Sequence, residues 1–111
     1  MTAMKKKSSE RKRTPFPREI NFTTDFVDDW EKLERSGKHD MHRIKEAMSL
    51  LFMNEGSLPT EWKDHKLHGE LEGFRECHVK GDLLLVYRIS NKSSYEMVLF
   101  YRAGTHSEIF S

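Results

Sequence analysis

The sequence predicts an α+β domain in which an N-terminal strand and two helices precede a mainly antiparallel sheet. Three observations support this class: apolar residues recur every three or four positions between 22 and 52, strand-like runs begin after Gly73, and short polar gaps separate those runs. The first pattern is typical of amphipathic helices, and the other two are typical of β-hairpins. We expect the helices to pack on one face of a small sheet.

The chain divides into a basic N-terminal arm, residues 1–17, and a domain, residues 18–111. Residues 1–18 contain seven Lys and Arg and one Glu, so their net charge is +6. Residues 19–111 contain twelve basic and seventeen acidic residues, so their net charge is −5. Pro15 and Pro17 oppose a helix that continues out of the arm, because proline lacks an N–H donor. We interpret the arm as a flexible solvated tail, with nucleic-acid contact through counterion release as the alternative.

Two consecutive helices are predicted after a short strand, EINF at 19–22. Thr23 or Thr24 can cap the first helix, which carries Phe26, Trp30 and Leu33 at helical spacing and ends at Ser36-Gly37. Asp40 can cap the second, whose apolar stripe contains Met41, Ile44, Met48, Leu51 and Phe52 and closes around Asn54 and Gly56. The short link between them predicts an antiparallel hairpin.

A long polar loop, residues 58–73, separates the helices from three predicted strands. Loops of this length inside a small domain are commonly functional. The strands are FRECHV, DLLLVYRIS and YEMVLFYRA, at 74–79, 82–90 and 95–103. The gaps between them fit hairpin turns, so the three strands form an antiparallel meander with the apolar middle run at its centre.

Composition argues against several classes of protein. We expect a cytoplasmic protein without membrane contact, because no apolar run approaches the roughly 18 residues of a membrane span and no apolar stretch follows the early lysines. The single cysteine, Cys77, cannot form an intramolecular disulfide. Adjacent Cys77 and His78 point to opposite faces of a strand, and His65 and His68 lie outside any recognisable zinc spacing. We therefore expect neither a metal nor a cofactor.

Strand parity gathers candidate catalytic groups on one face of the predicted sheet. Phe74, Glu76 and His78 share a side, and Asp82 follows across a tight turn. If Arg102 faces the same side, His65 from the loop and His106 from the tail could close over this group. Imidazoles exchange protons near neutral pH, and a guanidinium can hold a phosphate through two hydrogen bonds. These are the parts needed to cleave a phosphodiester without a metal.

The segments WKDHKLHGELEGFRECHVKGDLLLVYRI and RAGTHSEIF resemble the YafQ branch of the RelE/ParE superfamily of bacterial toxins. The resemblance covers residues 19–110 and rests on a loop D-H-x-L, an R-[DE]-x-H-V strand, an Asp four residues after that His, and a terminal G-[ST]-H-x-x-[LI]-F. It implies a RelE-like microbial RNase fold and a ribosome-dependent mRNA endonuclease that needs no metal. It also implies a cognate antitoxin of the DinJ or RelB kind, usually with a ribbon-helix-helix domain, whose complex with the toxin binds operator DNA.

The resemblance assigns site residues by position. His65, His78, Asp82 and His106 match the family's loop histidine, strand histidine, strand aspartate and C-terminal histidine, Arg102 matches a phosphate-facing arginine, and Phe110 the following aromatic. Glu76 stands where better-known members have Asp. We expect the ribose 2′-OH to attack the adjacent phosphorus, with His106 as general acid and His65, or alternatively Asp82, as general base. The acid and base could be exchanged, with His78 orienting groups and Arg102 binding the phosphorane charge.

The acidic body conflicts with the positive surface expected of a ribosome binder. Either the positive residues Lys63, Lys66, Arg75, Arg88 and Arg102 cluster near the site, where Lys63 and Lys66 would contact substrate, or the arm supplies the charge. Two other functions remain open: a ParE-like toxin that inhibits gyrase by binding, and a non-catalytic nucleic-acid-binding module. The histidine set would have no purpose in the first of these.

Overall fold

Five strands form the centre of the structure, a computed structural model that describes residues 17–53, 56–91 and 94–110. The strands are β1 (Arg18–Phe22), β2 (His65–Lys66), β3 (Arg75–Lys80), β4 (Leu83–Asn91) and β5 (Glu96–Thr105). They form one sheet in the order β1-β5-β4-β3-β2, in which β1 lies parallel to β5 and every other pair is antiparallel. Strand β4 is therefore central, as its apolar sequence predicts.

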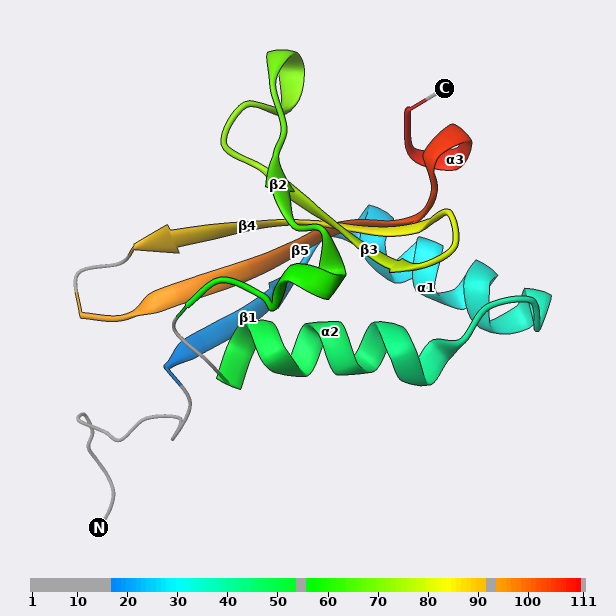
Figure 1. Ribbon diagram of the computed structural model, residues 1–111, viewed down its shortest axis with the longest axis horizontal. Helices are drawn as coiled ribbons and strands as arrows, with labels where there is room; N and C mark the ends of the chain where they lie inside the picture. Colours follow the sequence, from blue (N-terminus) through cyan, green and yellow to red (C-terminus); the bar gives the residue numbers. More distant parts are fainter. Residues whose placement is uncertain (1–16, 54–55, 92–93, 111) are drawn as a thin grey trace, which may run out of the picture.

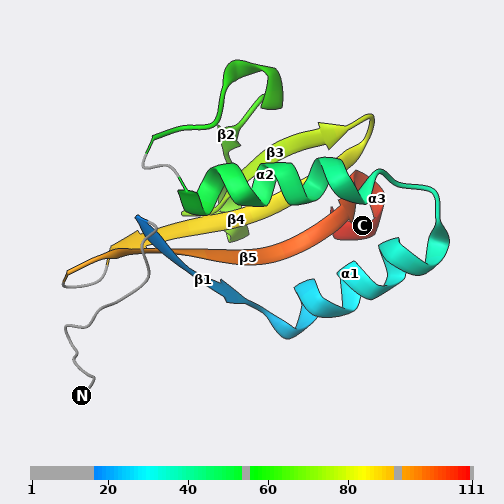
Figure 2. The same ribbon diagram turned by 90° about the horizontal axis from the view of Figure 1, so that it is seen from below.

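Helices lie on both sides of this sheet. They are α1 (Thr24–Ser36), α2 (Met41–Met53) and the short α3 (His106–Phe110), with two 3₁₀ turns, η1 (Thr60–Trp62) and η2 (Gly69–Leu71), in the loop before β3. Figure 1 shows α1 and α2 below the sheet, whereas the loop that carries β2 and the C-terminal α3 rise above it. Figure 2, the view from below, shows α2 in front of β3 and β4, α1 beside β5, and α3 behind the end of β5.

The two long helices begin and end where their sequences predict. Thr23 caps α1, since its Oγ1 accepts a hydrogen bond of 2.9 Å from the N–H of Phe26, and Gly37 ends that helix in the left-handed conformation at φ 66°. Asp40 caps α2, since its Oδ1 accepts from the N–H of Arg43 at 3.1 Å. Caps of this kind each contribute roughly 1 kcal/mol.

The α+β class and the order of elements are confirmed, with three additions. The predicted N-terminal strand pairs in parallel with β5, which makes the sheet mixed, and the predicted loop contains the two-residue strand β2, which pairs with β3. The segment after β5 forms the short helix α3. Apart from Pro17, the arm of residues 1–17 lies outside the described residues, as does Asn54 at the end of the second helix.

The hydrophobic core fills the space between the sheet and the long helices. Its centre is the row Cys77, Leu85 and Ala103, which lie side by side on β3, β4 and β5. Further core residues from strands, helices and the loop are Phe26, Leu33, Ile44, Ala47, Leu51, Leu58, Trp62, Val79, Leu83, Tyr87, Val98 and Phe100. Burial of each large apolar side chain contributes about 1.5–3 kcal/mol relative to exposure.

The helices α1 and α2 run in opposite directions, as predicted, but they do not close fully on each other (Figure 2). An apolar groove of about 420 Å³ is lined by Phe22, Phe26, Val27, Trp30, Glu31, Glu34 and Met48. Phe22 and Val27 remain 49% and 46% exposed at this groove. None of the helices in the described ranges is long and apolar enough to cross a membrane.

Candidate active site

The face of the sheet opposite α1 and α2 carries most of the candidate catalytic residues. Strand register aligns Glu76, Val86 and Arg102 in one row and His78, Leu84 and Gly104 in the next. Residues paired across strands point to the same side, so Glu76, His78 and Arg102 share a face, as their parity predicts. We call this surface the site face.

Helix α3 folds back over the site face at Gly104. A Cβ at Gly104 would lie 2.9 Å from Glu108 Oε1 and 3.6 Å from Ile109 Cγ1. A capping box fixes this turn: Thr105 N–H donates to Glu108 Oε1 at 2.7 Å, and Glu108 N–H donates to Thr105 Oγ1 at 3.3 Å. His106 is therefore presented at the start of a helix that packs on β5, on the face of the sheet that carries His78.

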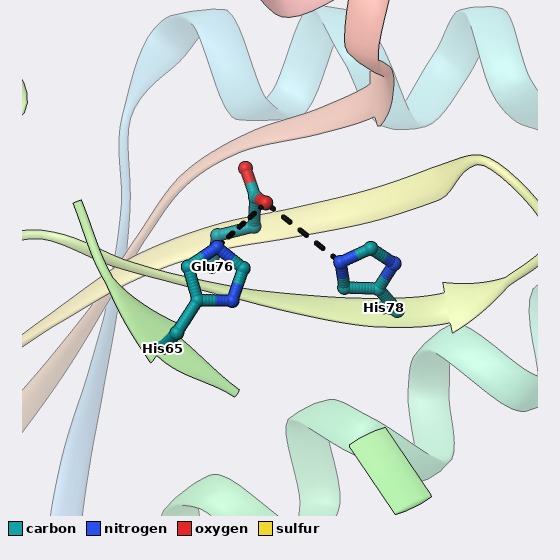
Figure 3. A group of neighbouring side chains, drawn as sticks. All are labelled: His65, Glu76 and His78. Atoms are coloured by element: carbon teal, nitrogen blue, oxygen red, sulfur yellow. Dashed lines mark ion pairs between the residues drawn. The ribbon is translucent and has the colours of Figure 1, made fainter. Parts of the chain in front are cut away.

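Two histidines meet one buried carboxylate on the site face (Figure 3). His65 Nε2 lies 3.1 Å from Glu76 Oε2, and His78 Nε2 lies 3.9 Å from the same oxygen. The two imidazole rings are 5.9 Å apart between centroids. Glu76 is 6% exposed, whereas both histidine side chains remain partly open to solvent. The structure thus brings His65, Glu76 and His78 together as the core of the site.

The hydrogen bonds of His65 limit what this residue can do. Its Nδ1 lies 2.9 Å from the carbonyl oxygen of Lys63, while its Nε2 faces Glu76. A carbonyl and an ionised carboxylate can only accept hydrogen bonds, so both contacts are satisfied together when both ring nitrogens carry protons. Both ring nitrogens of His65 are therefore directed at protein acceptors rather than at open solvent. The role of His65 as general base stays a prediction.

A buried network next to His65 holds the loop on the sheet. Arg75 Nη2 and Nε donate to Asp64 Oδ2 at 2.8 and 3.0 Å, and the Tyr87 hydroxyl donates to Asp64 Oδ1. Burial, followed by the hydrogen bond to Asp64, raises the pKa of Tyr87, so the phenol stays protonated and remains a donor. The hydrogen bond to Asp64 likewise raises the pKa of Arg75. This network fixes the residue that precedes His65.

Arg102 lies on the site face, but its guanidinium binds a carboxylate of α1. Nε and Nη2 donate to Asp29 at 2.7 and 3.1 Å, and the N–H of Ala103 also donates to Asp29 Oδ2, at 3.0 Å. The hydrogen bond to Asp29 raises the pKa of Arg102. Arg102 is therefore held in one orientation, and among the described residues its Nη1 has no hydrogen-bond partner.

The remaining predicted site residues are exposed and lie outside the cluster. The rings of His106 and Phe110, both within α3, are tilted with centroids 4.9 Å apart. Asp82 lies in the turn between β3 and β4, and within the described ranges it makes no hydrogen bond or ion pair with the histidines. Lys63 and Lys66 flank His65 in the loop, with Lys66 on β2.

The expected cluster of positive charge is only partly present. Arg75 and Arg102 are each paired with a buried carboxylate, Asp64 and Asp29 respectively. Arg88, Lys63 and Lys66 are exposed. Two of the five basic residues are thus largely neutralised by the structure.

The cluster has the composition of a transition-metal site, which the sequence analysis did not recognise. Ligand atoms of His65, Glu76 and His78 all lie within 4.8 Å of one another and could hold a metal ion. Two imidazoles and one carboxylate are a common ligand set for zinc and related ions. The sequence places Cys77 beside His78 but carries no signal for β2, the strand that brings His65 next to Glu76 on β3.

Three buried polar residues were missed from the sequence: Asp64, Tyr87 and Asp29. A signal existed for Asp29, since it lies three residues after Phe26 and four before Leu33, on the buried stripe of α1. A buried aspartate on such a stripe requires a cationic or N–H partner. Asp64 and Tyr87 are 23 residues apart, and no local pattern connects them.

A family model and a curated relative both indicate that this chain is similar to YafQ toxins. The family model described as the bacterial YafQ toxin of type II toxin-antitoxin systems matches residues 18–111. The mRNA interferase toxin YafQ of Escherichia coli K12 is 36% identical over 93 residues, which cover 84% of this chain and 96% of the relative.

Two sets of solved structures share the fold. YafQ in the DinJ-YafQ toxin-antitoxin complex of E. coli has a TM-score of 0.73 at 35% identity, with 86% of this chain and 99% of that chain covered. A metal-bound toxin from Helicobacter pylori has a TM-score of 0.71 at 38% identity, covering 84% and 99%. The chain belongs to the YafQ family of bacterial toxins of type II toxin–antitoxin systems.

Proposed function

We propose that the chain is an mRNA interferase, a toxin that cleaves mRNA on the ribosome and so inhibits translation. The observation that carries the proposal is Glu76, held between His65 and His78 on the site face, with His106 presented over the same face by α3. Family membership supports the same activity, since the E. coli relative is an mRNA interferase. A toxin that acted only by binding would have no use for this arrangement.

The proposed reaction is attack by the ribose 2′-OH on the adjacent phosphorus. The new O2′–P bond forms as the P–O5′ bond breaks, leaving a 2′,3′-cyclic phosphate and a free 5′-OH. Glu76 is the proposed base that removes the 2′-OH proton, because it is the carboxylate held between the two histidines, and His65 and Asp82 stay the alternatives predicted from the sequence. His106 is the proposed acid that protonates the leaving 5′-oxygen.

The other groups stabilise charge or bind substrate in this proposal. His65 and Arg102 stabilise the charge that develops on the phosphorane, and His78 orients Glu76. Lys63 and Lys66 bind phosphates of the RNA, and Phe110 supports His106 through the contact between their rings. No step requires a metal.

We propose a DinJ- or RelB-like antitoxin as the partner of this chain, because an E. coli relative forms a complex with DinJ. The apolar groove between α1 and α2 is the proposed contact surface, since Phe22 and Val27 are widely exposed there. Glu31 and Glu34 line the same groove, so a matching antitoxin segment would carry apolar side chains flanked by Lys or Arg. Binding of the complex to operator DNA would then depend on the antitoxin.

Induced expression followed by primer extension on cellular mRNA tests the activity. We expect A-site cleavages with the wild-type protein and none with His106→Gln, while His42→Gln, an exposed histidine of α2, serves as the matched control and cleaves as wild type. Growth inhibition by His106→Gln equal to that of wild type would contradict the assigned acid. DNA damage without RNA cleavage would instead identify a gyrase inhibitor, and neither effect would identify a binding module.

A further inference from the structure

A second patch on the site face consists of Phe74, Arg88 and Tyr101, which we call the aromatic platform. The rings of Phe74 and Tyr101 are tilted with centroids 4.5 Å apart, and the Arg88 guanidinium carbon lies 5.0 Å from the centroid of the Phe74 ring. We propose that this platform stacks a base of the mRNA next to the cleaved nucleotide. The inference rests on the proposed nuclease function and identifies a binding site for its substrate.

The platform lies directly beside the catalytic cluster. Phe74 lies immediately before β3 and two residues before Glu76, which corresponds to about 7 Å along an extended chain. Tyr101 precedes Arg102 on β5, where the register shifts, since Val86 pairs with Arg102 but Tyr87 pairs with Phe100. Tyr101 is the extra residue of this bulge, and bulges commonly redirect a side chain next to an active site.

The chemistry of the platform suits single-stranded RNA. Proteins bind unpaired bases by stacking them on aromatic rings and on arginine guanidinium planes, often on the open face of a sheet. Phe74 and Tyr101 are partly exposed and Arg88 is exposed. Within the described ranges Arg88 has no carboxylate partner, whereas Arg102 on the same face is paired with Asp29. Arg88 therefore retains a charge that can attract RNA.

A purely structural role for the two rings must be separated from binding. Val86 is fully buried although it points to the site face, and Phe74 and Tyr101 meet over the strand that carries it. The rings therefore also cover Val86. A leucine at either position keeps an apolar cover but removes the π-face on which a base can stack.

The test uses ribosomes programmed with a short mRNA that has 2′-deoxyribose at the cleaved nucleotide, so binding is measured without cleavage. Two versions of the RNA carry 2-aminopurine on one side or the other of that nucleotide, because stacking on an aromatic ring quenches its fluorescence. We expect quenching with one version by wild type, and its loss with Tyr101→Leu and Phe74→Leu. We also expect at least about fivefold weaker binding, the low end of the reported loss for one stacked base.

Controls distinguish the platform from general effects. Tyr101→Phe should recover the quenching, since the ring alone supplies the stacking surface. Arg88→Ala should weaken binding more than Arg35→Ala, which removes an exposed charge from α1, and Phe22→Leu provides a matched aromatic loss on the helix-covered face. Thermal melting of the Leu variants should stay close to that of wild type.

Two results separate failure of this inference from failure of the nuclease function. Equal quenching and affinity in wild type, Tyr101→Leu and Phe74→Leu, with normal cleavage of all-ribose mRNA by wild type, would overturn the platform alone. An absence of cleavage by wild type would instead overturn the function, whatever the binding result.

Discussion

The two faces of the sheet differ in the side chains that they carry, which are apolar on one face and charged or aromatic on the other. On the helix-covered face the strands contribute the apolar row Cys77, Leu85 and Ala103, and beyond them α1 and α2 leave an apolar groove. On the site face the same strands carry Glu76, His78 and Arg102 beside the rings of the aromatic platform. Because alternate residues of a strand point to opposite faces, one register serves both the core and the proposed chemistry. The comparison predicts that changes on one face leave the activity of the other intact.

The largest effect is expected for Glu76→Gln on the site face. Loss of the carboxylate removes the proposed base, which should lower the single-turnover rate of mRNA cleavage on ribosomes by roughly 100-fold or more. Glu72→Gln, an exposed neighbour in the same loop, is the matched control and should cleave at the wild-type rate. Antitoxin affinity should not change. A wild-type rate for Glu76→Gln would exclude Glu76 as the base and leave His65 and Asp82.

A change in the groove should have the opposite pattern. Val27→Asp introduces a carboxylate that the antitoxin would have to bury, so we expect at least about tenfold weaker antitoxin binding in calorimetry and normal mRNA cleavage. Because Val27 is exposed, the substitution should change the free energy of unfolding of the free toxin little. Unchanged antitoxin affinity would show that the partner covers another surface.

Transition-metal ions should act on the site face alone. Zinc binding to His65, Glu76 and His78 would occupy the proposed base, so cleavage should slow by about tenfold at saturation and recover on chelation. Zinc should also raise the melting temperature of wild type more than that of His78→Ala. A chelator that spares the Mg²⁺ of the ribosome should leave the basal rate unchanged. Loss of that rate would show that catalysis requires a metal.

The smallest effect concerns the dry core beneath the sheet. Burial, followed by the charges of Asp64 and Glu76, raises the pKa of Cys77 from 9.0 to about 12. Between these values the unfolded chain releases a proton that the folded chain keeps, so the free energy of unfolding should fall as pH rises above 9, by up to about 1.4 kcal/mol per pH unit. Urea titrations at pH 8 and 10.5 should show a smaller fall for Cys77→Ala. An equal fall in the free energy of unfolding for wild type and Cys77→Ala would indicate that folding does not raise the pKa of this thiol.

Much of the fold could be predicted from local patterns, whereas the site depended on long-range contacts. The caps Thr23, Gly37 and Asp40 act within a few residues, so the helix ends follow from the sequence. Strand parity correctly grouped Glu76 with His78. The position of His65 requires the pairing of β2 with β3, and that pairing is held by Asp64, Arg75 and Tyr87. Such tertiary hydrogen bonds leave no periodic signal.

The role of Arg102 shows the same limit. Its parity correctly places it on the site face, but the sequence does not reveal that Asp29 reaches over the edge of β5, where β1 has ended. The carboxylate satisfies the unpaired N–H of Ala103 and the guanidinium together. The positive charge of Arg102, which the sequence suggests is available to a phosphate, is therefore paired with Asp29 in the fold.

The capping box of α3 has a consequence for how the toxin loses activity. A helix of five residues cannot persist alone in water, so the position of His106 depends on the two reciprocal hydrogen bonds between Thr105 and Glu108 and on the contact with Gly104. Such a terminal segment opens locally at a lower free energy than the sheet. Inactivation on warming should therefore precede unfolding, because His106, the proposed general acid, is released before the proposed antitoxin groove is lost. A heated toxin that no longer cleaves mRNA should then still bind its antitoxin.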